Sequence, residues 1–401
     1  MRLICAYERI ALMHRRMAVM ALWISAVAIA VTACSSSATS SSSKSVATSS
    51  GSATATQASD AAGVAAAKAY LANVVSAPTS IGITTPLLRK PAQGKLIVHL
   101  LVDTPADQIV SADEAQAAAA LGWQYKTIGI GSQTNGIETA FNAALALKPA
   151  PFGIWISGYP RALIETQLKE AQSKGIVVVD TATADPVAAP IIANIDGPAQ
   201  QEIFAKEIAA EIVANSNGDA HVATFSISAY PVLTVFVDDL NMWLKNWCPA
   251  CTNKVVNQQI TDIGTTTPQS VVSTFEADPS LQYAVYSFGD ISLGVDAALK
   301  TAGLLGKVQQ VGQNPTLQDL ADLRNKTALA YIGYDNAVYA WRMIDSFARA
   351  SEGQSLSSVI NVPLPSQLLT QQDIGSMVAD SSGYFLAPKD YQAQFEKLWH
   401  V

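Results

Sequence analysis

The chain has 401 residues, of which 49% are hydrophobic and 14% are charged, and its formal net charge is −7. This length is typical of two or three domains, and the composition favours buried cores over disordered chain. An acidic chain lacks the basic surface that binds phosphates, so the composition excludes a nucleic acid partner. The 4 cysteines and 4 histidines have no spacing typical of structural zinc. We therefore expect no metal and no other cofactor.

The N-terminal residues carry the features of an exported protein. An apolar run over residues 17–33 follows the basic pair Arg15 and Arg16, which is typical of a signal peptide over residues 1–33. Either Met1 or Met13 could be its start. The run ends in a Val-Thr-Ala-Cys tetrad at residues 31–34, which resembles a bacterial lipobox. This resemblance implies cleavage before Cys34, lipidation of its thiol and anchoring to the outer face of the bacterial cytoplasmic membrane. The alternative is an uncleaved anchor helix with an incidental cysteine.

Residues 34–60 are nearly all Ser, Ala and Thr, a composition typical of a flexible linker. A helix is predicted over residues 61–75, followed by an irregular approach segment with three prolines over residues 76–94. The regular body then divides into two predicted lobes. The first covers residues 95–195 plus about 336–361, and the second covers residues 196–335 plus about 362–401.

Strands and helices alternate through both lobes. In the first lobe we predict strands at residues 95–102, 124–128, 152–156 and 176–179, and helices at 111–121, 136–147 and 161–173. In the second we predict helices at 199–214, 232–246, 268–276 and 292–302, and strands at 221–227, 254–260, 283–287 and 308–312. This alternation predicts an α/β protein with two doubly wound parallel sheets. Ligands of such sheets bind beyond the carboxyl ends of the strands, so a solute is expected between the lobes.

Several stretches, taken in order, resemble the type I periplasmic solute-binding proteins, the ribose-binding-like family. They are FGIWISG at residues 152–158, IANID at 192–196, YSFGD at 286–290 and AYIGY at 330–334. The resemblance extends from Lys95 to the C-terminus. It implies two lobes joined by a multi-strand hinge, and a monomer without enzymatic activity that delivers a small organic solute to the permease of an ABC importer. A ligand sensor that partners a membrane receptor is the alternative within this fold.

The chain departs from the sugar-binding members of this family at two positions. Those members usually carry an Asp-Arg pair after the fourth strand, where this chain has Asp180-Thr181-Ala182, and an arginine where this chain has Tyr230-Pro231. The planar guanidinium group makes bidentate hydrogen bonds that a sugar can use. Without these arginines, a less polar or aromatic solute becomes the expected ligand.

Polar and aromatic residues at the predicted strand ends are the candidate ligand contacts. Ordinary turn chemistry would also place many of them there, because Ser, Gly, Asp and Asn favour loops. The candidates are Asp103, Thr104, Gly158, Tyr159, Asp180, Thr181, Ser228, Tyr230, Phe288, Asp290, Asn314 and Tyr334.

Cys248 and Cys251 form a C-x-x-C pattern directly after Trp247. In redox enzymes such a pattern opens a helix, which lowers the pKa of the thiol. Here it closes a predicted helix in an exported chain, which favours a structural disulfide. A thiol-disulfide oxidoreductase is the competing hypothesis.

Overall fold

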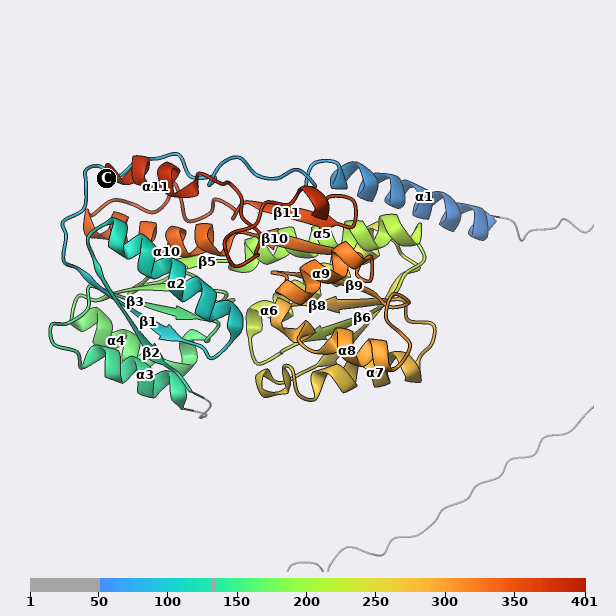
Figure 1. Ribbon diagram of the computed structural model, residues 1–401, viewed down its shortest axis with the longest axis horizontal. Coiled ribbons are helices and arrows are strands. Elements are labelled where there is room, and N and C mark those ends of the chain that lie inside the picture. The colour runs from blue at the N-terminus through green and yellow to red at the C-terminus, as the bar shows by residue number, and fades with distance from the viewer. Residues whose placement is uncertain (1–50, 132–134) are drawn as a thin grey trace, which may run out of the picture. The chain divides into compact units, whose positions relative to one another are not determined.

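The computed structural model describes residues 51–131 and 135–401, with side chains from residue 61 onward (Figure 1). The predicted signal peptide and Cys34 lie outside the described residues. Within the described part of the chain, no helix is both long enough and apolar enough to cross a membrane.

The first lobe has one sheet of five parallel strands in the order β2-β1-β3-β4-β5. Its central strands are buried apolar runs because helices cover both faces of the sheet. Helices α3 and α4 cover one face, and α2 and α10 cover the other (Figure 1). The bounds are β1 (Leu96–Leu101), α2 (Pro105–Ala120), β2 (Gln124–Gly129), α3 (Gly136–Leu145), β3 (Gly153–Ser157), α4 (Glu165–Ser173), β4 (Val177–Thr181), β5 (Ile191–Ile195) and α10 (Asn336–Ser351).

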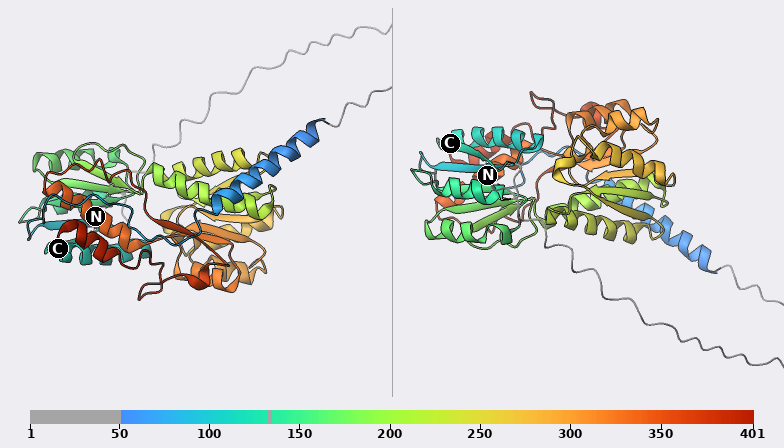
Figure 2. Two further views of the ribbon diagram at one scale, coloured as in Figure 1. Left: turned by 90° about the horizontal axis from the view of Figure 1, so that it is seen from above. Right: turned by 90° about the horizontal axis from the view of Figure 1, so that it is seen from below.

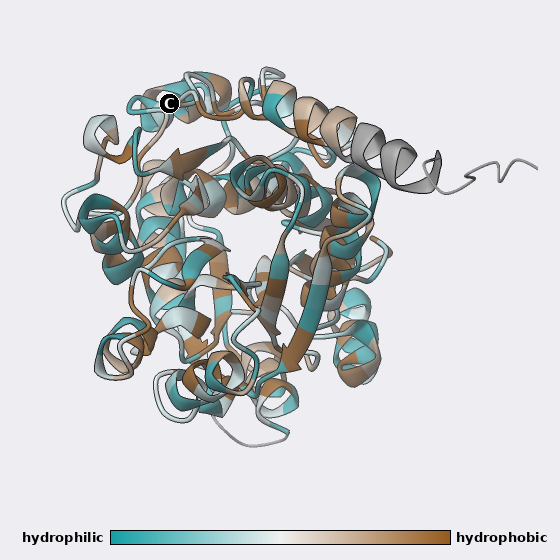
Figure 3. Cartoon of the chain, turned by 90° about the vertical axis from the view of Figure 1, so that its right-hand side faces the viewer, coloured by the Kyte–Doolittle hydropathy of each residue, from teal (hydrophilic) through white to brown (hydrophobic). Residues whose placement is uncertain are grey.

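The second lobe has a six-stranded sheet in the order β11-β10-β9-β8-β6-β7, in which only β11 is antiparallel to its neighbour. Helices α5 and α6 cover one face, and α7, α8 and α9 cover the other. The helices around the sheets carry both hydrophobic and hydrophilic residues, as the colouring of Figure 3 shows. In α6, Phe236 and Leu240 are buried, whereas Asp238 is exposed. The bounds are α5 (Pro198–Ser216), β6 (His221–Ser226), α6 (Pro231–Trp247), β7 (Thr252–Asn257), α7 (Thr267–Ala277), β8 (Tyr283–Tyr286), α8 (Val295–Thr301), β9 (Gln309–Gln313), α9 (Leu317–Asn325), β10 (Ala330–Tyr334) and β11 (Ser366–Thr370).

The chain passes between the lobes several times. It crosses to the second sheet between β5 and α5, returns between β10 and α10, and crosses again to form β11. Two α/β lobes built on parallel sheets, as predicted from the alternation of strands and helices, are thereby confirmed.

Helix α2 begins earlier than the sequence pattern predicted, at Pro105 instead of residue 111. The hydroxyl oxygen of Thr104 accepts a hydrogen bond from the N–H of Asp107 at 3.3 Å, and Pro105 occupies the first turn. Both features stabilise a helix start. This early start brings the first turn of α2 to the space between the lobes.

Helix α11 (Tyr391–Trp399) packs against α10 of the first lobe, whereas the sequence assigned residues 362–401 to the second lobe. The indole rings of Trp341 and Trp399 stack with their centroids 5.1 Å apart. The Nε1 of Trp399 donates a hydrogen bond to Asp345 at 2.8 Å. Of this segment, β11 joins the second sheet and α11 returns to the first lobe, because the buried face of α10 offers aromatic and ionic partners.

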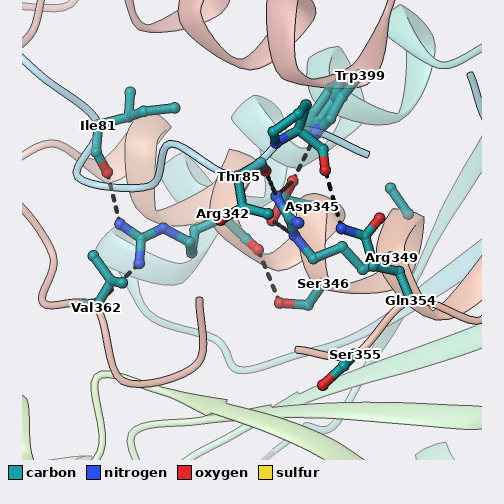
Figure 4. A network of polar contacts seen from close by, with 12 residues as sticks. Ile81, Thr85, Arg342, Asp345, Ser346, Arg349, Gln354, Ser355, Val362 and Trp399 are labelled. Atoms are coloured by element: carbon teal, nitrogen blue, oxygen red, sulfur yellow. Dashed lines mark hydrogen bonds and ion pairs between the residues drawn. The ribbon is translucent and has the colours of Figure 1, made fainter. Parts of the chain in front are cut away.

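Buried arginines of α10 hold the approach segment, residues 76–94, along that helix (Figure 4). Arg349 donates to Asp345 at 2.7 Å and to the carbonyl oxygen of Thr85 at 2.7 Å. Arg342 donates to the carbonyl oxygens of Ile81 at 2.7 Å and of Val362 at 2.8 Å. Segments far apart in the sequence are therefore fastened to one helix beside the crossovers.

Helix α1 (Gly51–Leu71) begins within the segment predicted as linker, residues 34–60, and ends before the predicted residue 75. It packs along α5 and α6 of the second lobe (Figure 2). The ammonium group of Lys206 lies 4.6 Å from the centroid of the Tyr70 ring and 4.1 Å from that of Trp243. A cation over aromatic rings in this geometry stabilises the contact between α1 and the second lobe.

Candidate ligand-binding cavity

A cavity of about 120 Å³ lies between the lobes, where residues that follow strands of both sheets face each other. Both lobes contribute to its wall, as expected for a solute that is enclosed between them. The first lobe and its crossovers supply Val102, Thr104, Ala106, Asp107, Val110, Ser157, Gly158, Ala182, Asp196 and Tyr339. The second lobe supplies Gln201, Tyr230, Val232, Leu233, Ile260, Ser287, Phe288, Gln313, Asn314 and Tyr334.

Half of the residues predicted from the sequence line this cavity. They come from the ends of strands in both lobes, as the parallel-sheet argument requires. They are Thr104, Gly158, Tyr230, Phe288, Asn314 and Tyr334.

Four predicted residues lie elsewhere. Asp103 and Ser228 are exposed to solvent. Asp180 and Thr181 are buried at the end of β4, where the carboxylate of Asp180 accepts hydrogen bonds from the N–H of Thr181 at 2.8 Å and from the hydroxyl of Thr183 at 3.2 Å. The hydroxyl oxygen of Thr181 accepts from Nε1 of Trp155 at 3.2 Å. These side chains stabilise the strand end.

The remaining two predicted residues, Tyr159 and Asp290, make contacts between the lobes outside the cavity wall. The rings of Tyr159 and Tyr230 meet edge to face with centroids 6.1 Å apart. The carboxylate of Asp290 accepts a hydrogen bond from the N–H of Ala106, at the start of α2, at 3.3 Å. Both contacts join the first lobe to the second next to the cavity.

Sequence reasoning missed several polar lining residues. Asp196 belongs to the IANID stretch, and Gln313 directly precedes the predicted Asn314, so both had a positional signal at a strand end. Asp107 and Tyr339 lie in the first turns of α2 and α10, where a strand-end pattern gives no signal. Their role depends on where those helices begin.

A chain of hydrogen bonds runs along the cavity from the crossover after β5 into the second lobe. The Nε2 of Gln201 donates to Oδ1 of Asp196 at 2.7 Å. The Nε2 of Gln313 donates to Oε1 of Gln201 at 2.9 Å and to the carbonyl oxygen of Ser287 at 2.7 Å. These bonds fix the orientation of both amides, and they use amide N–H groups within the protein.

The cavity wall carries acidic groups and, among the described residues, no Lys, Arg or His. Burial raises the pKa of Asp196 to about 7, although the hydrogen bond from Gln201 opposes the shift. Next to the wall, burial also raises the pKa of Asp290 to about 6, against the hydrogen bond from Ala106. Desolvation disfavours a charged carboxylate that has no cationic partner.

A buried polar cluster lies behind Asp107. The Nε2 of His99 is 3.2 Å from Asp107, and its Nδ1 is 2.9 Å from the hydroxyl of Tyr125. That hydroxyl donates to Glu114 at 2.7 Å. Burial lowers the pKa of His99, which favours the neutral ring, and raises the pKa of Glu114. Both shifts favour the neutral forms of these two groups.

Cys248 and Cys251 are joined by a disulfide at the C-terminal end of α6, and neither lines the cavity. Cys248 is completely buried. Within residues 51–131 and 135–401, no group of three or more His, Cys, Asp or Glu side chains is placed to hold a metal ion.

This sequence matches no protein-family model and no curated protein. Its structure is nevertheless similar to solved structures of solute-binding proteins. One is an ABC transporter solute-binding protein from Agrobacterium vitis with bound allitol, at 18% identity and a TM-score of 0.60 over 71% of this chain and 98% of that one.

A second similar structure is the 5-methylthioribose transporter solute-binding protein from Thermotoga lettingae, in complex with 5-methylthioribose. It has 15% identity and a TM-score of 0.65 over 78% of this chain and all of that one, 100%. A third is the arabinose-binding component from Shewanella sp. ANA-3, at 14% identity and a TM-score of 0.61 over 77% of this chain and 98% of that one. Similarity at this identity establishes the fold alone. The type I periplasmic binding protein fold predicted from the sequence is thus confirmed.

Proposed function

We propose that this protein is the extracytoplasmic solute-binding component of an ABC importer and carries out no catalysis. The observation that supports this most is the cavity to which both lobes contribute residues from their strand ends. A ligand that contacts both lobes favours their closed arrangement, which a permease can then distinguish from the open one.

The proposed ligand is a small organic solute that is less polar than a free sugar. The wall includes the apolar side chains of Val102, Val232 and Leu233 beside aromatic rings. The arginines of sugar-binding relatives are missing at Thr181 and at the start of α6. The Thermotoga protein in complex with 5-methylthioribose shows that this fold also encloses a partly apolar solute.

Thermal unfolding of the mature chain against sugars, polyols, small amines and small aromatic compounds tests this proposal. A bound solute should raise the unfolding free energy by about 2.7 kcal/mol at a hundredfold excess over Kd. Small-angle scattering should show closure of the lobes with the same solute.

Phe288→Ala should weaken binding about tenfold or more, because it removes an aromatic ring from the cavity wall. Leu163→Ala, which alters an exposed residue of the first lobe, is the matched control.

Unchanged affinity in Phe288→Ala would exclude this cavity as the binding site. Binding without any lobe closure would contradict the importer mechanism.

The proposal also includes a lipid anchor at Cys34 and a membrane permease as partner. Cys34→Ala should abolish lipid labelling of the full chain and release the protein from the membrane fraction. Persistent labelling in this variant would show that the lipobox assignment is wrong.

A further inference from the structure

Among the described residues of the cavity wall, the side chains that can carry a full charge near neutral pH are those of Asp107 and Asp196. The amide N–H groups of Gln201 and Gln313 that were described above point to Asp196, to Gln201 and to a carbonyl oxygen. An anion needs donors or cations from the wall, a polyol uses donors and acceptors alike, and an ammonium group needs acceptors. Uncharged groups of the wall, such as those of Asn314 and Tyr334, can serve a neutral ligand, whereas the carboxylates can also pair with a positive charge.

Asp196 is a buried acceptor of the wall that keeps free hydrogen-bonding capacity. It is only 9% exposed, lines the cavity and, within the described residues, receives a hydrogen bond only at Oδ1. Its second carboxylate oxygen is left for a ligand. A buried carboxylate without a cationic partner is unfavourable, as its raised pKa reflects. A positive charge from the ligand would remove this penalty.

Two aromatic rings line the same cavity as this carboxylate. Tyr334 and Tyr339 both line the cavity, and their rings meet edge to face with centroids 6.0 Å apart. Tyr334 is held from behind by the ring of Phe204, stacked at 5.4 Å. The faces of aromatic rings attract ammonium groups, most strongly in a desolvated site.

We propose that the solute is a compact organic cation, with an ammonium group that pairs with Asp196 beside the rings of Tyr334 and Tyr339. This inference rests on the proposed binding function, and it replaces the less polar solute named there with a solute that carries one positive charge. A cavity of about 120 Å³ restricts the ligand to a small molecule. The cation supplies the positive charge that Lys, Arg and His do not supply to the wall.

Calorimetric titration of the mature chain with pairs of compounds that differ in charge but little in shape tests the inference. The pairs are choline with 3,3-dimethyl-1-butanol, piperidine with tetrahydropyran, and ethanolamine with ethylene glycol. D-Allitol and D-ribose complete the set. At least one ammonium compound should bind about tenfold or more tightly than its neutral match, because only the cation pairs with the carboxylate.

The variant Asp196→Asn should remove most of this preference, with a loss of about tenfold or more for the cation and little change for its neutral match. This variant keeps the fold, because Asn tolerates the positive φ of 60° at this position and its side-chain oxygen still accepts from Gln201. Asp238→Asn is the matched control, since it changes net charge equally at an exposed residue of α6.

Several outcomes would overturn the inference. They are an equal affinity for the neutral match, an unchanged preference in Asp196→Asn, and no binding of any of the three ammonium compounds. Binding of D-allitol or D-ribose alone would contradict both the cationic ligand and the less polar ligand class, and would leave the importer function standing. Binding of an ammonium compound without lobe closure would support the cationic ligand class and contradict the importer function.

Discussion

At the scale of single residues, Gly158 controls how closely the lobes approach each other. It has a φ of +79°, and a Cβ at this position would lie 2.9 Å from the ring of Tyr230 in the opposite lobe. The absence of a side chain therefore permits the contact between Tyr159 and Tyr230. The same small residue lines the cavity.

We expect Gly158→Ala to weaken ligand binding about tenfold, because the added methyl group meets the Tyr230 ring as the lobes close. Gly175→Ala is the matched control, with a φ of +68° and nothing within 4 Å of the added Cβ. Both variants should lose about 1 kcal/mol of stability from backbone strain. Only Gly158→Ala should lose affinity, as measured by calorimetry. Equal affinities in the two variants would show that this contact does not limit closure.

The buried ion pair of Asp345 and Arg349 is a second feature whose stability depends on single residues. Both side chains have 0% exposure, and Asp345 also accepts from Trp399. Asp345→Asn leaves a buried guanidinium group without its counter-charge, so we expect a loss of about 3–5 kcal/mol in the free energy of unfolding. Glu170→Gln removes the partner of Lys174 at an exposed pair, with 37% and 45% exposure, and should lose less than about 1 kcal/mol. Urea denaturation measures both, and similar losses would contradict the role of burial.

At the scale of elements, α1 is docked on the second lobe through a close backbone approach. A Cβ on Gly63 would lie 1.9 Å from the carbonyl oxygen of Trp247 at the end of α6. Trp247 also packs on the ring of Tyr70, with centroids 5.9 Å apart. The helix that continues from the predicted linker is thus part of the folded body.

The variant Gly63→Ala distinguishes a docked helix from a free one by the sign of its effect. In a free helix, Ala in place of Gly stabilises by about 0.5–1 kcal/mol. In the docked helix the methyl group displaces α1, so hydrogen-exchange protection over residues 61–71 should fall. Ala62→Ser, at an exposed position of the same helix, is the control. Increased protection in Gly63→Ala would mean that α1 does not dock at this site.

At the scale of the whole molecule, many carboxyl groups are buried and have a raised pKa. Burial raises the pKa of Glu207 from 4.5 to about 8, that of Glu211 to about 7 and that of Asp335 to about 7. Such groups hold their protons in the folded state at a pH where the unfolded chain has lost them. Their stabilising effect is complete below the unfolded pKa and is lost as the pH rises through the folded pKa.

We therefore expect the free energy of unfolding to fall as the pH rises from about 5 to 8. Glu207→Gln should reduce this fall by on the order of 3 kcal/mol, since each pH unit between the unfolded and the folded pKa corresponds to about 1.4 kcal/mol. Glu202→Gln, at an exposed position of the same helix, is the control. Denaturation at both values of pH measures the difference. A fall of the same size in wild type and Glu207→Gln would contradict the assignment.

Local patterns in the sequence are enough to predict the two lobes, their parallel sheets and part of the cavity. The apolar runs that form β1 and β3 are buried on both faces. Their continuous hydrophobic composition predicts such burial. Thr104, Tyr230 and Asn314 follow strands, so the sheet topology places them at the cavity. These features depend on local patterns that repeat along the chain.

Which strand-end residues face the cavity, and which elements join the lobes, can be seen only in the tertiary structure. Asp103 points to solvent, Asp180 turns inward, and Asp196 reaches the cavity, although all three are acidic residues in or directly after a strand. The place of α11 follows from the stacking of Trp341 on Trp399. Such outcomes depend on contacts between residues that are distant in sequence. The local periodicity of hydrophobic residues contains no information about the energies of these contacts.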